Sequence, residues 1–352
     1  MTGVPEHSLQ PLSDEDLVLE EEGGLVHVRL NRPAQLNALS DGMLAGIGQA
    51  IDTAEGRTIL LDGAGRAFCA GGDIKAQALA IRAGRPEIPA DYFRREYGLN
   101  AKIHAYKRAP FVSYLNGIVM GGGYGVSGHG SHLVACEATR FAMPEVKIGF
   151  FPDVGAVFNL ARVPGELGTY MALTGNSVGA ADMIHIGLAH AYVPMDDFPR
   201  FRAVLVCEGA AREGVAAALD QTAQPVPDDG ILRRHEEMIA RCFAHDRVEA
   251  IVDALRSEGG DFAIETAMDI EARAPFAVKI ALGHIRKARG ETFETVIARD
   301  LALALRFLTV PDFAEGVRAA VIDKDRAPRW SPARLDQVDD KLVALYLGNP
   351  ES

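Results

Sequence analysis

Residues 116–155 read NGIVMGGGYGVSGHGSHLVACEATRFAMPEVKIGFFPDVG, and this stretch decides both the fold class and the chemistry. A glycine triplet at 121–123 follows the apolar run 111–115, and two carboxylates, Glu145 and Asp153, end the stretch in apolar surroundings. A strand that runs through glycines into a helix presents free backbone N–H groups, which stabilise an anion or a developing oxyanion. Carboxylates nearby can supply a base, an acid or a nucleophile. The stretch therefore indicates acyl or enolate chemistry.

The overall composition excludes several function classes. The chain has 352 residues and a net charge of −12, with a pI near 5.3. Phosphate backbones are bound by clustered basic residues, so we expect no nucleic-acid partner. The apolar runs are too short to cross a bilayer, and the acidic N-terminus does not resemble a signal or transit peptide. We therefore expect no membrane association.

The cysteines predict a reducing compartment. The four thiols are scattered without a C-x-x-C pair, so a disulfide framework is not indicated and a cytoplasmic location is expected. Cys69 has no basic neighbour in sequence, which favours a buried packing role over a nucleophile. His129 and His132 are three residues apart, but their glycine-broken segment offers no third ligand, so we expect no metal site.

Apolar periodicity outlines an α/β core followed by helices. Residues 26–30 and 58–61 alternate or cluster as strands, and a helix capped by Ser40 separates them. Asp73 is placed to cap a helix that starts at Ile74, and residues 80–95 look like a loop that leads into a helix over 92–106. The plan is a flexible arm (1–14), an α/β core (15–220) and a helical C-terminal region (221–352) that opens with a Pro- and Asp-rich linker. Helices are expected over 156–161, 167–173, 180–186, 200–213, 231–242, 247–257, 262–272, 276–289, 292–308 and 311–322, with strands at 111–115, 133–135, 140–142 and 189–193.

Several motifs together resemble the crotonase (enoyl-CoA hydratase/isomerase) superfamily. They are LNRP (30–33), NAL (37–39), AFCAGGDI (67–74), NG (116–117) with the glycine triplet, and MPE (143–145). The resemblance implies an α/β spiral of repeated strand–strand–helix units that binds an acyl-CoA thioester, with a helical C-terminal extension. It implies an oxyanion hole made by the backbone N–H groups of Gly72 and Gly122. The CoA moiety is expected along Ala67, Phe68, Ala70, Asp73 and Ile74.

The positions of the carboxylates limit which reaction of the superfamily this chain could catalyse. Hydratases of this superfamily use two glutamates, one of them just after the glycine triplet, where this chain has Gly125. Glu145 and Asp153, eight residues apart, instead resemble the pair of the 3-hydroxyisobutyryl-CoA hydrolase subfamily. The YFRREY segment (92–97) is similar to that subfamily's helix, whose glutamate, here Glu96, contacts substrate. The run GVRAAVIDKD (316–325) extends the resemblance to nearly the whole chain.

The resemblance implies a thioester hydrolase that converts 3-hydroxyisobutyryl-CoA to 3-hydroxyisobutyrate and CoA, a step of valine catabolism. Its substrate-binding residues would be Glu96, Gly122, Glu145 and Asp153, with the last two catalytic. Glu145 could attack the carbonyl or deprotonate water, and Asp153 could orient the 3-hydroxyl, handle a proton or be the nucleophile. No cofactor or metal is expected beyond the CoA of the substrate.

Three alternatives stay open. A hydratase or isomerase could work with Glu145 as the base, and a catalytically silent chain of this fold could bind a partner or RNA. Without the resemblance, Glu145 could simply pair with Lys147 or Arg140, and Asp153 could cap a helix.

Relatives often form homo-oligomers through C-terminal helices, although the extended end could cover its own core. The stretch 156–159, which departs from the subfamily pattern, was expected to line the acyl pocket.

Overall fold

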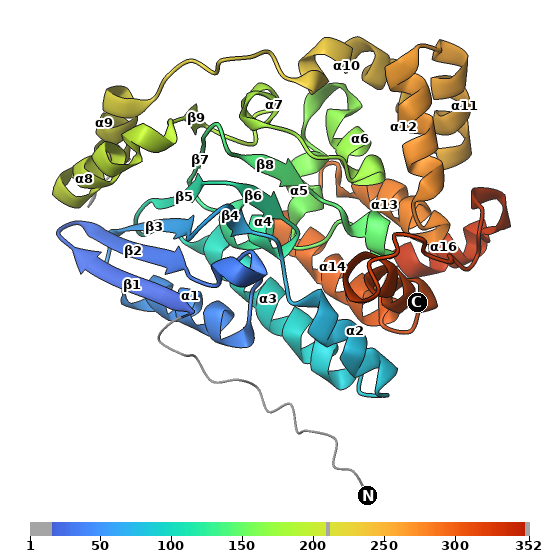
Figure 1. Cartoon of the computed structure of the whole chain (residues 1–352), viewed down its shortest axis with the longest axis horizontal. Coiled ribbons are helices and arrows are strands. Elements are labelled where there is room, and N and C mark those ends of the chain that lie inside the picture. Colours follow the sequence, from blue (N-terminus) through green and yellow to red (C-terminus); the bar gives the residue numbers. More distant parts are fainter. Residues whose placement is uncertain (1–15, 209–211, 349–352) are drawn as a thin grey trace, which may run out of the picture.

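The computed structural model describes residues 16–208 and 212–348, so the predicted N-terminal arm lies outside the described residues. The predicted strand–strand–helix repeat is confirmed (Figure 1). Three successive units are β1 (Leu17–Glu22), β2 (Leu25–Leu30) and α1 (Asp41–Thr53); β3 (Thr58–Gly63), β4 (Ala67–Cys69) and α2 (Ile74–Arg82); and β5 (Phe111–Leu115), β6 (Ile118–Met120) and α4 (Gly122–Ser127). The long helix α3 (Glu87–Ala105) enters between the second and third units.

The two strands of each later unit go to different sheets. The larger sheet has the order β1-β2-β3-β5-β7-β9, and the smaller one has the order β4-β6-β8, where β7 is His132–Ala135, β8 is Arg140–Ala142 and β9 is Ala191–Tyr192. Apart from the β1–β2 hairpin, neighbouring strands are parallel. β3 and β5 are buried throughout, as is typical of parallel strands covered on both faces. Because β4 and β6 pair in parallel, the glycine-rich turns that follow them meet at one edge of the small sheet.

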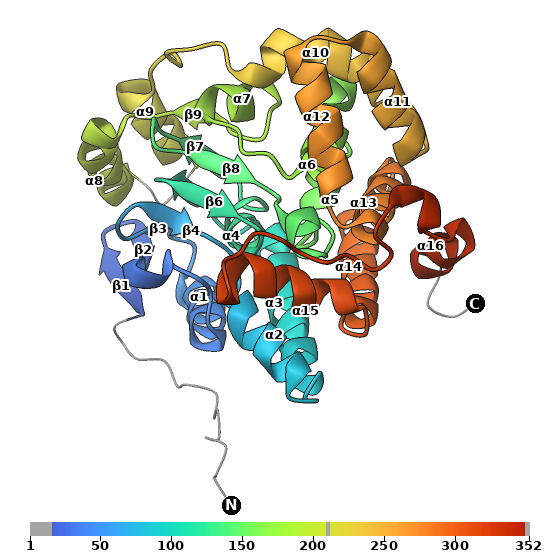
Figure 2. The same cartoon turned by 45° about the vertical axis from the view of Figure 1, so that its right-hand side comes forward.

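Helices account for most of the described chain after β8. After β8 come η2 (Glu145–Ile148), α5 (Ala156–Leu160), α6 (Leu167–Thr174), α7 (Ala180–His185), α8 (Phe198–Glu208), α9 (Arg212–Thr222), α10 (Ile231–Cys242), α11 (Val248–Glu258), α12 (Asp261–Ala272), α13 (Pro275–Ala288), α14 (Phe293–Phe307), α15 (Pro311–Val317) and α16 (Asp340–Leu347). α14 packs on α3, and α15 packs on α2 and η2. Figures 1 and 2 both show the C-terminal helices against the core of their own chain, with α15 beside α2.

Two sequence predictions of secondary structure were wrong. Residues 80–95 are mostly helical, because α2 runs to Arg82 and α3 already begins at Glu87. Pro89, which suggested a loop, lies in the first turn of α3, where its missing N–H would have no helical partner in any case. The single helix expected over 200–213 is described as α8 and α9, with residues 209–211 between them outside the described residues.

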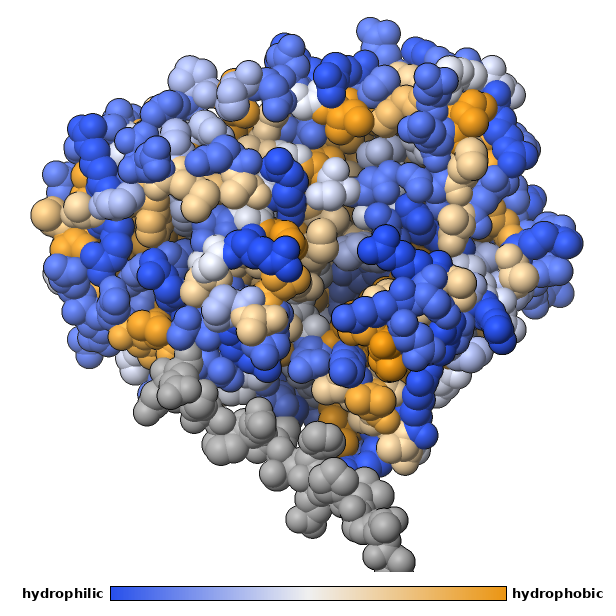
Figure 3. All heavy atoms as spheres, viewed as in Figure 1, coloured by the Kyte–Doolittle hydropathy of each residue, from blue (hydrophilic) through white to orange (hydrophobic). Residues whose placement is uncertain are grey.

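The described residues contain no helix long and apolar enough to cross a membrane. The face seen in Figure 3 is largely hydrophilic, with hydrophobic side chains in small separate groups. The core lies inside, where one large apolar cluster joins the sheets to the C-terminal helices. The C-terminal helices therefore contribute to the same core as the strands.

Candidate active site

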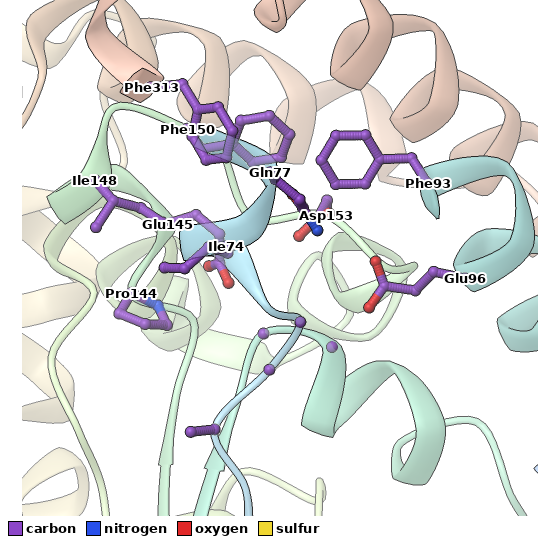
Figure 4. A pocket seen from close by; sticks show the side chains of 15 residues that line it. Ile74, Gln77, Phe93, Glu96, Pro144, Glu145, Ile148, Phe150, Asp153 and Phe313 are labelled. Carbon is purple, nitrogen blue, oxygen red and sulfur yellow. The ribbon is translucent and has the colours of Figure 1, made fainter. Parts of the chain in front are cut away.

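A cavity of about 80 Å³ opens where the two glycine-rich turns meet η2 and α3. Its outer lining is half-buried and comes from Ala70, Ile74, Pro144 and Ile148, whereas its inner lining is buried. The inner end carries three aromatic rings and three carboxylates, which Figure 4 shows pointing into one space. The lining residues at this end are Phe93, Phe150, Phe313, Glu96, Glu145 and Asp153.

Gly72 and Gly122 lie together at the wall of this cavity. A Cβ atom placed on Gly122 would lie 3.3 Å from the backbone nitrogen of Gly72 and only 2.3 Å from Oε1 of Glu96. Any larger residue at 122 would therefore displace Glu96 or close the gap between the turns. Within the described chain, neither Gly72 N–H nor Gly122 N–H donates to a backbone or side-chain acceptor. Two unpaired donors beside one cavity could both bind the same oxygen.

Gly121 explains how the second turn is made. Its backbone has φ of 49° and ψ of −123°, a conformation open mainly to glycine. A Cβ atom there would lie 2.9 Å from Oε1 of Glu145. The glycine triplet therefore makes the turn and also leaves room for the Glu145 carboxylate beside the free amides.

Glu145 enters the cavity as the first residue of η2. Its side chain is 6% exposed, and its Oε2 atom has no hydrogen-bond partner among the described residues. The two cations that could have paired with it bind elsewhere, because Lys147 donates to the Asn176 side chain and Arg140 to backbone carbonyls. A buried carboxylate without a cation is costly, which is typical of a site that reserves it for chemistry.

Asp153 lies in the loop between Phe151 and α5, and its side chain is 5% exposed. Its Oδ2 accepts a short hydrogen bond from the hydroxyl of Tyr97 on α3. It does not cap α5, because that helix begins only at Ala156 and has no side-chain cap. The alternative that Asp153 serves as a helix cap is therefore excluded.

Glu96 completes the cluster from α3. It is 3% exposed, and its Oε1 lies 3.4 Å from the hydroxyl of Tyr92, one turn earlier on the same helix. The Tyr92 ring also lies against Gly72, since a Cβ there would come within 2.7 Å of the hydroxyl oxygen. The face of α3 thus supports both the glycine turn and a carboxylate.

The three carboxylates perturb one another. Burial raises the pKa of Glu145 well above its ordinary value, and the charges of Asp153 and Glu96 raise it further. Burial likewise raises the pKa of Asp153 to about 7, against the lowering effect of the Tyr97 hydrogen bond. Burial and the charge of Asp153 raise the pKa of Glu96 well above its ordinary value. The cavity therefore holds groups able to exchange protons near neutral pH.

The predicted CoA-binding residues fall into two groups. Ala70 and Ile74 line the mouth of the cavity, while Ala67 and Phe68 are buried in β4, where their carbonyls accept from the side chain of Asn37. Asp73 caps α2 by accepting from the N–H of Ala76 at 3.2 Å, as expected. The expectation that residues 156–159 line the pocket was wrong, because none of them reaches this cavity.

Cys69, His129 and His132 are held by packing and hydrogen bonds outside the carboxylate cluster. Burial raises the pKa of the Cys69 thiol to about 12, so it is a packed thiol and not a nucleophile. His129 contacts the carbonyl of Val154, and His132 contacts Ser131, so the two rings do not converge. The described residues contain no group of three or more His, Cys, Asp or Glu side chains arranged to hold a metal.

Position 125 has no space for a glutamate. A Cβ atom on Gly125 would lie 2.9 Å from both Nδ2 of Asn100 and Cβ of Val154. The carboxamide of Asn100 is fully buried there, and neither of its polar atoms has a partner within the described chain. The site therefore lacks the second glutamate of the two-glutamate hydratases for a steric reason as well as by sequence.

Sequence reasoning missed the residues that come from distant elements. Tyr97 was part of the quoted YFRREY segment but received no role, although its place one residue after Glu96 on a helix was a usable signal. Phe313 reaches the cavity from α15 in the C-terminal region, and no local pattern marks it. Phe93 and Phe150 stack with ring centroids 5.6 Å apart, and Phe150 and Phe313 are 5.1 Å apart.

Comparison with known proteins agrees with this geometry. Residues 25–347 match the family model described as enoyl-CoA hydratase/isomerase. The mitochondrial 3-hydroxyisobutyryl-CoA hydrolase of Xenopus tropicalis is 37% identical, over 97% of this chain and 91% of its own length. The 3-hydroxyisobutyryl-CoA hydrolase 1 of Arabidopsis thaliana is also 37% identical, over 98% of this chain and 94% of its own.

Two solved structures superpose on nearly the whole chain. A carnitinyl-CoA dehydratase from Mycobacterium thermoresistibile is 37% identical with a TM-score of 0.88, covering 95% of this chain and 97% of that one. An enoyl-CoA hydratase from Rhodobacter sphaeroides is 32% identical with a TM-score of 0.86, covering 96% and 98%. The fold prediction is thereby confirmed.

One prediction is overturned by the same comparison. The cytoplasmic location rested on the scattered cysteines, but the Xenopus, chicken, mouse and human relatives, at 36–38% identity, are all named as mitochondrial proteins. Unpaired thiols indicate a reducing compartment only, and they do not distinguish one such compartment from another. The match over residues 25–347 and the relatives at 36–38% identity nevertheless agree on the family: this chain belongs to the enoyl-CoA hydratase/isomerase family.

Proposed function

We propose that this chain is an acyl-CoA thioester hydrolase that acts on 3-hydroxyisobutyryl-CoA and releases 3-hydroxyisobutyrate and CoA. One observation carries the proposal: two unpaired backbone donors share a cavity with Glu145 and Asp153, while Gly125 leaves no second hydratase glutamate. Relatives named 3-hydroxyisobutyryl-CoA hydrolase, at 36–38% identity over most of the chain, support it.

In this proposal the thioester oxygen binds between Gly72 N–H and Gly122 N–H. When a nucleophile adds to the carbonyl carbon, that oxygen becomes an oxyanion. The hydrogen bonds from both N–H groups become stronger as its negative charge grows. One such donor typically contributes about 10²–10³ in rate. Because these amides have no acceptor among the described residues, they need not break a hydrogen bond before they donate to the oxyanion.

Glu145 is the main catalytic carboxylate. It either attacks the carbonyl carbon, giving a mixed anhydride that water opens, or removes a proton from a water that attacks directly. In both routes the carbon–sulfur bond breaks, CoA leaves as a thiolate that takes up a proton, and a water oxygen ends in the product acid. Its raised pKa makes the ionised form a stronger base.

Asp153 and Glu96 shape the other side of the acyl group. Asp153 is proposed to orient the 3-hydroxyl and to exchange a proton, which suits a carboxyl whose pKa is about 7. Glu96 is proposed to contact the substrate beside Gly122. The proposal requires no cofactor, since CoA enters as part of the substrate, and CoA binding along residues 67–74 remains a prediction.

The inner end of the cavity favours a short acyl group. Phe93, Phe150 and Phe313 are each at most 5% exposed and close that end with stacked and tilted rings. An unbranched long acyl chain would have to displace this packing, which costs free energy. A methyl group more or less changes binding by only about 1–3 kcal/mol, so 3-hydroxypropionyl-CoA is expected as a poorer substrate and not as a rejected one.

A second function is favoured by the two solved structures, a carnitinyl-CoA dehydratase and an enoyl-CoA hydratase. Glu145 alone could serve as the base that removes or returns an α-proton while Gly72 and Gly122 hold an enolate oxygen. This reaction keeps the carbon–sulfur bond intact. Hydration and hydrolysis are therefore separable by whether free thiol appears.

The test is a panel of acyl-CoA esters incubated with the unmodified protein, with free thiol and enoyl absorbance followed together. We expect rapid thiol release from 3-hydroxyisobutyryl-CoA, slower release from 3-hydroxypropionyl-CoA and none from long-chain esters. Turnover of crotonyl-CoA or carnitinyl-CoA without thiol release from any ester would contradict the hydrolase and support the second function.

A further inference from the structure

The loop Asp153–Gly155 is held in a strained conformation. Val154 has φ of +53°, which is a true outlier for a β-branched residue, and Gly155 follows with φ of +74°. Such a conformation costs about 1–3 kcal/mol and persists only where its surroundings hold it. The strain lies next to a carboxylate of the cavity, so whatever holds the loop also aims Asp153.

Three side chains from other elements hold the loop. Tyr97 on α3 donates to the Asp153 carboxylate. His129 lies 2.7 Å from the Val154 carbonyl through Nε2, which must carry the proton because a carbonyl only accepts. Gly155 N–H donates to Oδ2 of Asp300 at 2.7 Å.

Asp300 comes from α14, 145 residues along the chain from Gly155, and its side chain is fully buried. Its other oxygen, Oδ1, lies 2.5 Å from Nε2 of His284 on α13. The second ring nitrogen of His284 faces the Arg299 guanidinium at 3.5 Å, and a guanidinium only donates. The Nε2–H of His284 donates to Asp300, and Asp300 thus accepts from two N–H groups.

We propose that Asp300 is a positioning residue of the active site, aimed by His284, which fixes the strained loop and places a carboxylate behind Asp153. The inference rests on the proposed function, because that function gives Asp153 its role. It goes further in assigning part of the catalytic geometry to the C-terminal helices. It also gives a role to the carboxylate buried at position 300, which contacts His284 and the N–H of Gly155.

The charged and titratable groups around Asp300 are few. His284 faces it from α13, and Arg299 lies beyond that ring and is itself paired with Glu291. Toward the active site lie Asp153 and Tyr97, and the charge of Asp300 raises the pKa of both. Removing that charge should therefore lower the pKa of Asp153. Loosening of the loop would admit water and lower this pKa too, because burial raises it, so the shift is compared between forms whose thermal unfolding is the same.

The test compares four forms of the full-length protein. Asp300→Ala removes both the acceptor and the charge. Asp300→Asn combined with His284→Gln removes the charge but keeps an amide oxygen for Gly155 N–H and a polar partner behind it. His284→Gln alone keeps a donor toward Asp300 and separates the effect of losing the ring from the effect of losing the charge. The readouts are thermal unfolding, kcat and KM across pH, and a ¹³C-carboxyl aspartate NMR titration of Asp153 assigned with Asp153→Asn.

For the charge-free pair we expect the Asp153 titration and the matching limb of the rate profile to move down by about 0.5–1 pH unit. Asp300→Ala should lower kcat by about 10–100-fold with little change in KM, because a misplaced group costs rate more than binding. His284→Gln keeps the Asp300 carboxylate but loses the ring that aims it, so kcat should fall by less than in Asp300→Ala and the Asp153 titration should not move down. If Asp300→Ala fails to fold, the double variant Asp300→Asn with His284→Gln still shows whether Asp300 affects the titration of Asp153.

An unshifted Asp153 titration in the charge-free pair, or a loss of rate that only follows the folded fraction, would overturn the proposal. The NMR titration needs no turnover. If the unmodified protein releases no thiol from any ester, the proposed function fails, and the titration still decides separately whether Asp300 sets the state of Asp153.

Discussion

Two segments bring the catalytic carboxylates into the same cavity, and they hold them in opposite ways. Glu145 begins η2, whose backbone is fixed by close packing against α15: a Cβ on Gly316 would lie 2.3 Å from the backbone of Ile148. Among the described residues no other side chain donates to its carboxylate: Oε2 has no partner, and the hydrogen bond that lowers its pKa comes from the backbone of Glu145 itself. Asp153 lies in a strained loop, and its carboxylate is fastened by Tyr97 while Asp300 holds the next turn of chain.

The difference separates a reacting group from an orienting one. A carboxylate with a free oxygen beside two unpaired amides can approach a bound thioester carbonyl without first losing a hydrogen bond. A carboxylate already bound by a hydroxyl is restricted in direction, which suits the recognition of a substrate hydroxyl. The predictions below test this division, from the largest expected effect to the smallest.

Glu145→Gln should have the largest effect. The amide keeps the shape of the side chain but cannot act as a base or as a nucleophile, so kcat should fall by about 10²–10⁴-fold with KM nearly unchanged. Thiol release at saturating substrate measures it. The exposed Glu87→Gln on α3 is the matched control and should retain full activity. A Glu145→Gln variant with more than a tenth of normal kcat would contradict the assignment.

Gly122→Ala should come next. The added Cβ would lie 2.3 Å from Oε1 of Glu96 and 3.3 Å from the Gly72 nitrogen, so it would crowd the oxyanion site. We expect a loss of about 10²–10³ in kcat/KM. Gly98→Ala is a well-matched control, because its Cβ on α3 would meet nothing within 4 Å. Equal losses in the two variants would show that the effect is one of folding and not of the oxyanion site.

Asp153→Asn should lower kcat by about 10–100-fold and should also move the pH profile. The charge of Asp153 raises the pKa of Glu145, so removing it should lower that pKa and shift the rising limb of activity to lower pH. The limb near pH 7, which belongs to Asp153 itself, should disappear. Rates measured from pH 5 to 9 check both changes, and a profile identical to that of the unmodified protein would exclude Asp153 from catalysis.

Tyr97→Phe should have a smaller effect on rate, and it should move the pH profile in the opposite direction. The Tyr97 hydroxyl lowers the pKa of Asp153, so its removal should raise that pKa above about 7 and move the corresponding limb up by about 0.5–1 unit. We expect kcat at pH 7 to fall by less than about tenfold. A shift toward lower pH would contradict the hydrogen bond as drawn.

The smallest effect concerns stability. The pKa of Glu145 is raised above its ordinary value of 4.5, so the folded protein holds this proton more firmly, and the side chain costs stability as pH rises above that value. Glu145→Gln removes this cost. Its unfolding temperature at pH 8 should exceed that of the unmodified protein by about 2 °C, and the difference should vanish near pH 4. An equal difference at both pH values would mean that the gain is unrelated to charge.

Sequence alone indicated the fold and most of the cavity. The glycine turns and the MPE segment predicted that Gly72, Gly122 and Glu145 would meet, and the structure brings them to one cavity together with Glu96 and Asp153. These residues could be predicted from the sequence because each lies in a short motif whose neighbouring residues determine its backbone conformation. The strand–strand–helix order was visible in the same way, from local periodicity.

The missing parts depend on packing between distant elements. Asp300 and His284 lie in ordinary amphipathic helices, and nothing nearby in sequence distinguishes them from surface residues until α13 and α14 are placed against the Asp153 loop. Phe313 reaches the cavity for the same reason. The start of α3 at Glu87 was missed, because residues 80–95 were predicted as a loop, although a proline in the first turn, here Pro89, leaves no helical hydrogen bond unmade.

The most direct measurement is thiol release from 3-hydroxyisobutyryl-CoA by the unmodified protein, by Glu145→Gln and by Asp153→Asn, under one set of conditions. The division between the two segments predicts rapid release by the unmodified protein, a rate lower by about 10²–10⁴-fold for Glu145→Gln and an intermediate rate for Asp153→Asn. Thiol release that survives Glu145→Gln but is abolished by Asp153→Asn would reverse the two roles, and no release from the unmodified protein would contradict the hydrolase itself.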